Sequence, residues 1–225
     1  MSTLTSLETL LSKRHSCRAF LNTPVARCDI EQIVRVAGLV PSWCNAQPWQ
    51  IVVTDHEETA RFSDALKEHL QSAKPAPDLP FPSGYTGLHK ERRRTCGFQL
   101  YDAVGIEKGD RAASGTQMME NFNFFGAPHV AIISSSVELG GYGAMDCGGF
   151  ITAFTLAAQA LGIASIPQAA IAPYAPFIRN YFDLAEDRMI LCAISFGYAD
   201  KDHPANAFRT TRAPLGEILD WKEGQ

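Results

Sequence analysis

A long, nearly apolar stretch at residues 143–161 is the feature that most constrains how this chain folds. Its residues predict one long helix. A membrane helix needs about 20 apolar residues in a row, whereas the most apolar window, 150–166, is interrupted by Thr152, Gln159 and Ser165. We therefore expect no membrane span, and we expect this helix to be central and buried in a globular fold.

Shorter segments of other periodicity surround this helix. Strands are predicted at 50–54, 130–134 and 189–197, with a short extended piece at 164–167. Helices are predicted at 2–13, at 30–40 with Asp29 as N-cap, and at 57–73, 88–104 and 116–125, with a loop at 105–115. The proline-rich segment 74–84 is predicted to be an exposed extended loop. The length of 225 residues, without internal repeats, fits a single domain over 1–225.

The composition excludes several classes of protein. With 46% hydrophobic residues the chain can bury a core, which excludes a disordered protein. The formal net charge is −4, and Glu91 interrupts the main basic run, so no nucleic-acid partner is expected. The six cysteines form no CxxC pair, which argues against a zinc site and a disulfide framework. The N-terminus lacks the pattern of a signal peptide, so we expect a cytoplasmic protein.

Two arginines and a serine alternate directly after the first predicted helix. Residues two apart in an extended segment project to the same side, so Arg14, Ser16 and Arg18 can converge on one anion. Two guanidinium groups and a hydroxyl suit a phosphate. The alternative is a set of solvated cations favoured by the helix C-terminus.

The loop at 41–49 carries a second alternating pair, Asn45 and Gln47. Each amide offers donors and an acceptor, the mixture that the pyrimidine edge of a flavin requires. The alternative is a turn in which polar side chains bond only the local backbone.

Two further segments fit a flavin less specifically. The small side chains at 166–170 allow a backbone N–H to approach a flat ring near flavin N5, although the segment also fits an ordinary tight connection. Arg209 and Arg212 supply further charge for a phosphate, although two arginines in a polar tail also fit a solvent-exposed surface.

Other chemistries have little support in the sequence. There is no GxSxG elbow, no phosphate-binding GxxxxGK[ST] loop and no histidine pair at metal-ligand spacing. His129, at the start of a strand, is expected to be structural. We therefore assign no catalytic side chain and no metal ligand. No ribose-reading motif indicates whether NADH or NADPH is used.

In this order along the chain, four motifs resemble the FMN-dependent nitroreductase family: residues 14–18, the loop 41–49, residues 160–162 before Pro167, and residues 209–214. The resemblance implies an α+β fold with a central mixed β-sheet wrapped by helices. It also implies a homodimer that holds FMN at the subunit interface.

The resemblance also implies roles for residues of this chain. The FMN phosphate and ribityl chain would be bound by Arg14, His15, Ser16, Arg18, Arg209 and Arg212. The partner subunit would contribute Pro41, Ser42, Trp43, Asn45 and Gln47. Backbone near the ring would come from Pro167, Gln168, Ala169 and Ala170, where many relatives carry Glu-Gly and a side-chain role of that acid is lost here.

Two segments lie outside these motifs. The insertion at about 74–115 resembles lids that shape a substrate pocket, with Tyr85, Arg92 and Tyr101 as candidate contacts. The polar stretch at about 198–225 is expected to be a C-terminal tail that docks on another surface.

The implied activity is a ping-pong reaction in which NADPH or NADH reduces FMN and FMN then reduces a nitroaromatic compound. The reduction would pass by two-electron steps to nitroso and hydroxylamine products. Three alternatives remain open: a quinone or flavin reductase on the same scaffold, an FMN- or anion-binding protein without turnover, and a structural dimer that associates through Phe122, Phe124 and Phe125.

Overall fold

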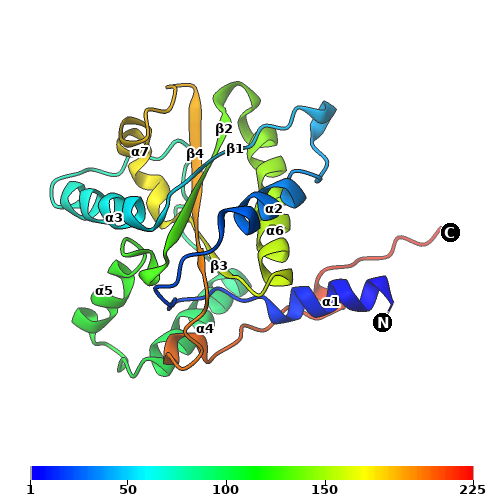
Figure 1. Cartoon of the computed structure of the whole chain (residues 1–225). Helices are drawn as coiled ribbons and strands as arrows, with labels where there is room; N and C mark the ends of the chain where they lie inside the picture. The colour runs from blue at the N-terminus through cyan, green and yellow to red at the C-terminus, as the bar shows by residue number, and fades with distance from the viewer. Residues whose placement is uncertain (1, 225) are drawn as a thin grey trace.

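Four strands form one antiparallel sheet in the order β1-β2-β4-β3 in the computed structural model, which describes residues 2–224 (Figure 1). The strands are β1 (Gln50–Val53), β2 (His129–Ser136), β3 (Ala164–Gln168) and β4 (Arg188–Gly197). Alternate residues of β2 enter different cores: Val130 and Ile132 on one face, Ala131 and Ile133 on the other. The central strands are therefore buried on both faces, as in a three-layer fold.

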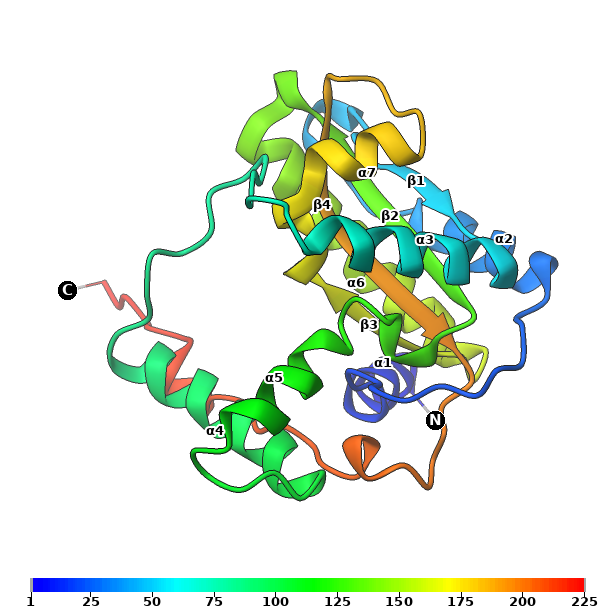
Figure 2. The same cartoon turned by 90° about the vertical axis from the view of Figure 1, so that its left-hand side faces the viewer.

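Helices cover both faces of the sheet. They are α1 (Thr3–Lys13), α2 (Arg27–Ala37), α3 (His56–Leu70), α4 (Gly87–Ala103), α5 (Arg111–Met119), α6 (Gly140–Ala160) and α7 (Ala175–Tyr181). Figure 2 shows α3 and α7 in front of the sheet and α2 and α6 behind it, while α4 and α5 lie beside the sheet. The α+β class is therefore confirmed. All four strands pair antiparallel, and the parallel pairing among residues 2–224 is an isolated bridge between Ser16 and Ser165, which corrects the expected mixed sheet.

The three predicted strands are confirmed with small changes at their ends and the extended piece at 164–167 is the strand β3, but the helices need three corrections. The helix α2 begins at Arg27 with Ala26 as N-cap, so Asp29 lies inside its first turn, where a carboxylate is favoured by the helix dipole. The segment 105–115 is not all loop, because Asp110 accepts a hydrogen bond from the Ala113 N–H at 2.9 Å and starts α5. The helix α7 was missed; two prolines in and before its first turn obscured its spacing.

The expectation that α6 is buried is only half correct. Its residues Phe150, Phe154 and Ala158 pack in the core, but Tyr142 and Met145 are exposed. The reason is that the helix lies with one side on the sheet, and its other side is covered only in part, for example where Tyr142 meets Trp43 of the loop at 41–49. No helix among residues 2–224 is both long and apolar enough to cross a membrane.

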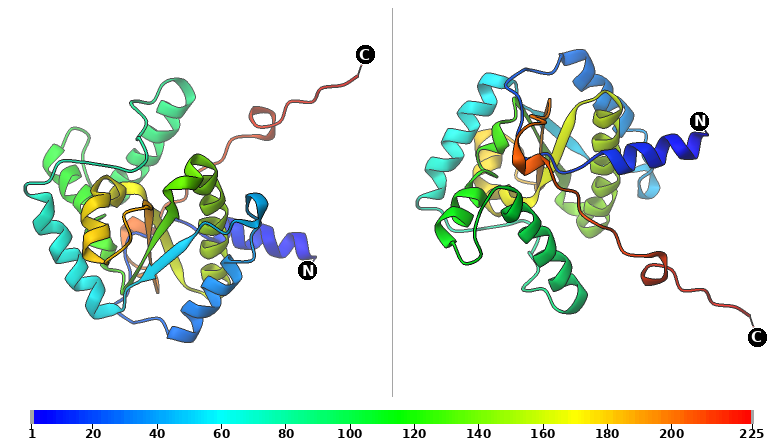
Figure 3. Two further views of the ribbon diagram at one scale, coloured as in Figure 1. Left: turned by 90° about the horizontal axis from the view of Figure 1, so that it is seen from above. Right: turned by 90° about the horizontal axis from the view of Figure 1, so that it is seen from below.

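Both ends of the described chain leave the body of the fold (Figure 3). Helix α1 contains no buried residue although it carries Leu4, Leu7 and Leu11. The C-terminal segment extends away in an open conformation, with Ile218 71% exposed and Trp221 76% exposed. These segments therefore present an exposed apolar surface.

Candidate functional site

The segment that follows α1 is extended and anchored beside β3. The Arg14 N–H bonds the Leu10 carbonyl at 3.0 Å and ends the helix. Ser16 then forms the parallel bridge to Ser165, and the Cys17 N–H donates to the Ser165 carbonyl at 3.2 Å. This extended geometry is the one that the alternation of Arg14, Ser16 and Arg18 required.

A cavity of about 420 Å³ gathers the charged residues of this segment and of the C-terminal segment. Its lining includes Arg14, His15, Ser16, Arg18, Arg209 and Arg212, which we call the arginine cavity. Among residues 2–224, none of its four arginines lies within 4.0 Å of an acidic group. The structure thus brings together six predicted residues that are 198 positions apart at the extremes, with their positive charge unpaired.

Neutral groups hold three of these guanidinium groups in place. The Arg18 group donates to the Ser16 carbonyl at 3.2 Å and lies 5.5 Å from the centre of the Phe208 ring. Arg209 donates to the Phe208 carbonyl at 2.7 Å, and Arg212 donates to the Thr210 hydroxyl at 2.8 Å. Carbonyl and hydroxyl oxygens orient a guanidinium without neutralising it, so the cavity keeps its attraction for an anion.

Burial lowers the pKa of three basic groups in this cavity, and neighbouring arginines add to the effect for two of them. Burial, followed by the nearby Arg212, lowers the pKa of Arg14, and burial lowers the pKa of Arg18. The pKa of His15 is lowered first by burial and also by the neighbouring arginines. The His15 Nδ1 lies 3.3 Å from the Lys13 carbonyl, and its Nε2 is buried without a partner among residues 2–224. A neutral imidazole of this tautomer offers an unused acceptor to a hydroxyl group.

The loop at 41–49 has an unusual backbone. Three residues that are not glycine have positive φ: Cys44 at 50°, Asn45 at 57° and Gln47 at 47°. Each such residue costs about 1 kcal/mol or more, and strained residues of this kind cluster at functional sites. The Asp146 carboxylate accepts from the Trp43 N–H at 3.0 Å, and Ser42 Oγ accepts from the Gln47 N–H at 2.9 Å. The loop is thus exposed but held in one conformation.

This loop and the arginine cavity lie at opposite ends of α6 (Figure 1). Asp146, which holds the loop, is near the start of the helix, whereas Ser165, which pairs with the cavity segment, follows its end. The turns between them span about 20 Å. The structure therefore does not bring the predicted residues Pro41, Ser42, Trp43, Asn45 and Gln47 into the cavity of the same chain.

The same bridge joins the cavity segment to β3 at Ser165, near the start of the strand, and the predicted residues 167–170 follow at its other end. Pro167 and Ala169 are exposed, whereas Gln168 is 3% exposed, as the alternation of a strand dictates. Ala170 is half-buried. The backbone of 167–170 is therefore presented to the solvent side, while the Gln168 side chain points inward.

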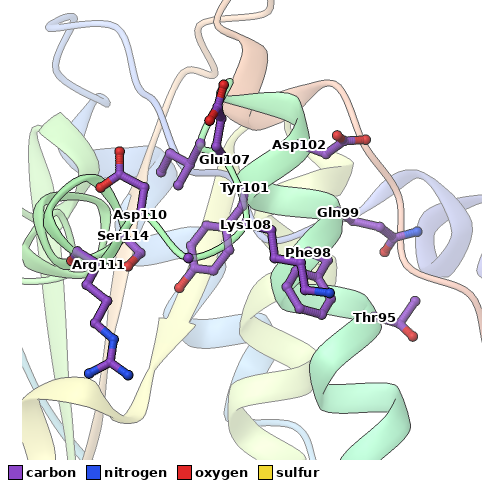
Figure 4. A pocket seen from close by; sticks show the side chains of 12 residues that line it. Thr95, Phe98, Gln99, Tyr101, Asp102, Glu107, Lys108, Asp110, Arg111 and Ser114 are labelled. Atoms are coloured by element: carbon purple, nitrogen blue, oxygen red, sulfur yellow. Dashed lines mark hydrogen bonds between the residues drawn. The ribbon is translucent and has the colours of Figure 1, made fainter.

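A second cavity of about 530 Å³ lies between α4 and α5. Figure 4 shows Phe98 and Tyr101 of α4 beside it, with Lys108 near Phe98 and Arg111 on the opposite side. The other lid candidates lie elsewhere: Tyr85 and Arg92 line a cavity between α4 and the C-terminal segment. There the Arg92 guanidinium pairs with the Glu217 carboxylate. The three candidates therefore do not share one cavity.

Several residues at these places were missed in the sequence. Cys96 of α4 and Phe208 line the arginine cavity, and Asp146 fixes the loop. Phe208 stands beside Arg209, but no local pattern marks the other two, because each meets its partner only through the tertiary fold. His129 is structural as expected, since its Nδ1 donates to the Thr54 carbonyl and its Nε2 accepts from the Val25 N–H, both at 3.0 Å.

Comparison with known proteins places this geometry in one family. A model of the nitroreductase family matches residues 11–198. The chain is 32% identical to a 4-nitrobenzoate reductase of Pseudomonas putida over 91% of its length and 90% of that protein. It is 34% identical to the nitroreductase NfnB of Mycolicibacterium smegmatis over 93% of its length and 90% of that protein.

Solved structures agree with the sequence matches. A crystal structure of the FMN-dependent nitroreductase NfnB from Mycobacterium smegmatis in complex with NADPH superposes with a TM-score of 0.93. The identity is 32%, and the alignment covers 99% of this chain and 100% of that one. On the family match and these two relatives, the chain belongs to the nitroreductase family.

Proposed function

We propose that this chain is an FMN-dependent nitroreductase that uses NADPH or NADH to reduce nitroaromatic compounds in two-electron steps to nitroso and hydroxylamine products. The observation that carries the proposal is the arginine cavity, with four guanidinium groups and no acid within 4.0 Å among residues 2–224. The relatives are named for 4-nitrobenzoate reduction and for FMN and NADPH use.

The residues present fit FMN at its polar end. A phosphate dianion would offset part of the unpaired charge of Arg14, Arg18, Arg209 and Arg212, and it would weaken the repulsion from Arg212 that adds to burial in lowering the pKa of Arg14. The free Nε2 of His15 accepts a hydrogen bond from a ribityl hydroxyl, which is the kind of donor that FMN carries next to its phosphate. Ser16 adds a hydroxyl on the same wall.

When bound, FMN supplies the two-electron redox chemistry that links NADPH oxidation to nitro reduction. The backbone N–H groups of residues 168–170, further along β3, would supply donors to the flavin ring. Such fixed donors stabilise negative charge without reorganisation. The carboxamides of Asn45 and Gln47 would bind the polar edge of the ring, and solvent would supply the protons.

We infer that the working unit is a homodimer with FMN at the subunit interface. The cavity and the loop at 41–49 lie at opposite ends of α6, so one chain holds two separate halves of a site. A second copy that brings its loop to the cavity completes the site. The exposed leucines of α1, the open face of α6 and the apolar C-terminal segment provide the surface for this association.

The segments outside the core take matching roles. We propose that 1–225 is one domain in which the insertion at 74–115 forms a lid over the substrate, with Tyr101 of α4 turned toward a cavity. The tail at 198–225 docks on the second copy, while the Arg92–Glu217 pair holds it against α4.

A visible-light titration tests the proposed function. The purified protein is loaded with FMN, reduced anaerobically with NADPH, and then mixed with either 4-nitrobenzoate or a quinone. We expect the flavin absorption to bleach with NADPH and to return with 4-nitrobenzoate. A protein that binds no FMN overturns the proposal, and a flavin that only a quinone reoxidises assigns a quinone reductase instead.

A further inference from the structure

Gln168 makes a chain of hydrogen bonds that joins three parts of the fold. Its side chain is 3% exposed at the end of β3. The Nε2 group donates to the Asn121 carbonyl at 2.9 Å and to the Asn121 Oδ1 at 3.4 Å. Its Oε1 accepts from the hydroxyl of Ser195, which is fully buried in β4.

The chain continues beyond Gln168 toward α5. The Asn121 Nδ2 donates to the Met118 carbonyl at 2.9 Å, so its Oδ1 is left as an acceptor for Gln168. Asn121 follows the last turn of α5 and precedes the turn in which Phe124 and Phe125 have positive φ. The hydrogen bonds of this series run in one direction. The Gln168 amide donates through its nitrogen to Asn121, and the Asn121 amide donates through its nitrogen to the Met118 carbonyl at the end of α5.

We propose that Gln168 is a positioning residue of the flavin site, which ties the end of β3 to the C-terminal end of α5 through a neutral amide. This inference rests on the proposed function. The exposed residues Pro167 and Ala169 flank Gln168, so its buried amide holds in place the backbone that would face the ring in the proposed site. The N-terminal end of α5, from Arg111, belongs to the segment 74–115 that is proposed as the lid.

Only an uncharged donor satisfies the position. Two oxygens of Asn121 face the Gln168 nitrogen, so a carboxylate there would meet two acceptors without a hydrogen to share. A protonated carboxyl group restores one donor. The pKa of such a group is raised by burial and by the facing oxygens, so its function is retained at low pH and lost as the pH rises.

This difference gives a direct test with three variants. Gln168→Glu can donate only when protonated, Gln168→Met fills a similar volume without hydrogen bonds, and Gln32→Glu adds a carboxylate on the exposed side of α2 as a control. FMN affinity is measured for each by fluorescence titration at about pH 5.5 and about pH 8.5, always as a ratio to the natural protein.

We expect Gln168→Glu to bind FMN about tenfold more weakly at the higher pH, the effect of one uncompensated buried hydrogen bond, and to recover at the lower pH. Gln168→Met should be weakened at both pH values, and Gln32→Glu at neither. Equal affinities of Gln168→Glu and the natural protein at both pH values overturn the proposal. So does an equal loss for Gln168→Glu and Gln168→Met at both, because packing then explains the effect.

A second measurement does not depend on FMN. The free energy of unfolding in urea is followed against pH without flavin, and Gln168→Glu should lose stability relative to the natural protein as the pH rises, whereas Gln32→Glu should not. If the natural protein binds no FMN, the proposed function fails while this measurement still decides on the amide. If the free energy of unfolding changes with pH in the same way for Gln168→Glu and Gln32→Glu, the proposed role of the Gln168 amide is wrong.

Discussion

Replacing Arg14 with alanine separates an anion-binding role from a structural one, because the two roles predict opposite changes. Arg14 lines the arginine cavity, and its pKa is lowered by burial and by Arg212. Without a bound anion its charge is therefore unfavourable. The truncation should leave the free energy of unfolding of the FMN-free protein unchanged or higher, while it weakens FMN binding.

The size of the loss follows from the contact that is removed. A hydrogen bond between charged groups contributes about 1.5–3 kcal/mol, which corresponds to roughly a tenfold to hundredfold rise in the Kd for FMN. Because the other three arginines stay in the cavity, binding should be weakened rather than abolished. The loss should shrink as salt is added, since part of it is screened.

Fluorescence titration of FMN into the flavin-free protein measures the effect, and inorganic phosphate should compete. Arg27→Ala is the matched control, because Arg27 is an exposed arginine of α2 paired with Glu31 and lies outside the cavity. An unchanged Kd for Arg14→Ala, or the same loss in both variants, refutes the assignment of the cavity to the phosphate.

Three further predictions concern the loop, the buried histidine and the tail. Asp146→Ala removes the acceptor of the Trp43 N–H and should lower kcat/KM for 4-nitrobenzoate severalfold in steady-state assays with little loss of stability; unchanged kinetics contradict this role of the loop. Burial lowers the pKa of His129, so the free energy of unfolding should be highest above pH 6.5, the ordinary pKa of histidine, and should fall as the pH drops below it. Urea unfolding of His129→Asn should show a shallower fall with pH, and the same fall in both proteins contradicts this role of His129. Ile218→Glu places a charge on the exposed apolar tail and should shift sedimentation from dimer toward monomer, whereas a full dimer refutes its place in the interface.

Features that depend on near neighbours in the sequence were predictable. Spacing alone predicted α1 and α3, and the alternation after α1 predicted that Arg14, Ser16 and Arg18 share one cavity. The start of α5 was also within reach, because Asp110 is a residue that favours the N-cap. Gly105, Gly109 and Gly115 favour a loop over the same segment, so the N-cap signal competes with them.

Features that depend on distant partners were not predictable from spacing. Asp146 belongs to the site only because α6 brings it to Trp43, and Cys96 because α4 lies beside the cavity. The inward direction of Gln168 depends on the register of β3 against β4, which places its Oε1 at Ser195. The resemblance to a family proposed the backbone role of 167–170, but it gave no reason to examine the side chain.

The wrong prediction for α6 carries information of its own. An almost uncharged helix should be buried on all sides, yet this chain covers only the side with Phe150 and Phe154 and leaves Tyr142 and Met145 exposed. The loop that Asp146 holds lies beside that exposed side, and it is the half of the proposed site that the chain cannot use by itself. One event, the approach of a second copy to α6, would both bury this face and bring the loop to a flavin. The exposed apolar face of α6 and the incomplete flavin site therefore have one explanation. A substitution on this face that keeps the protein monomeric should abolish both the dimer and the turnover of FMN.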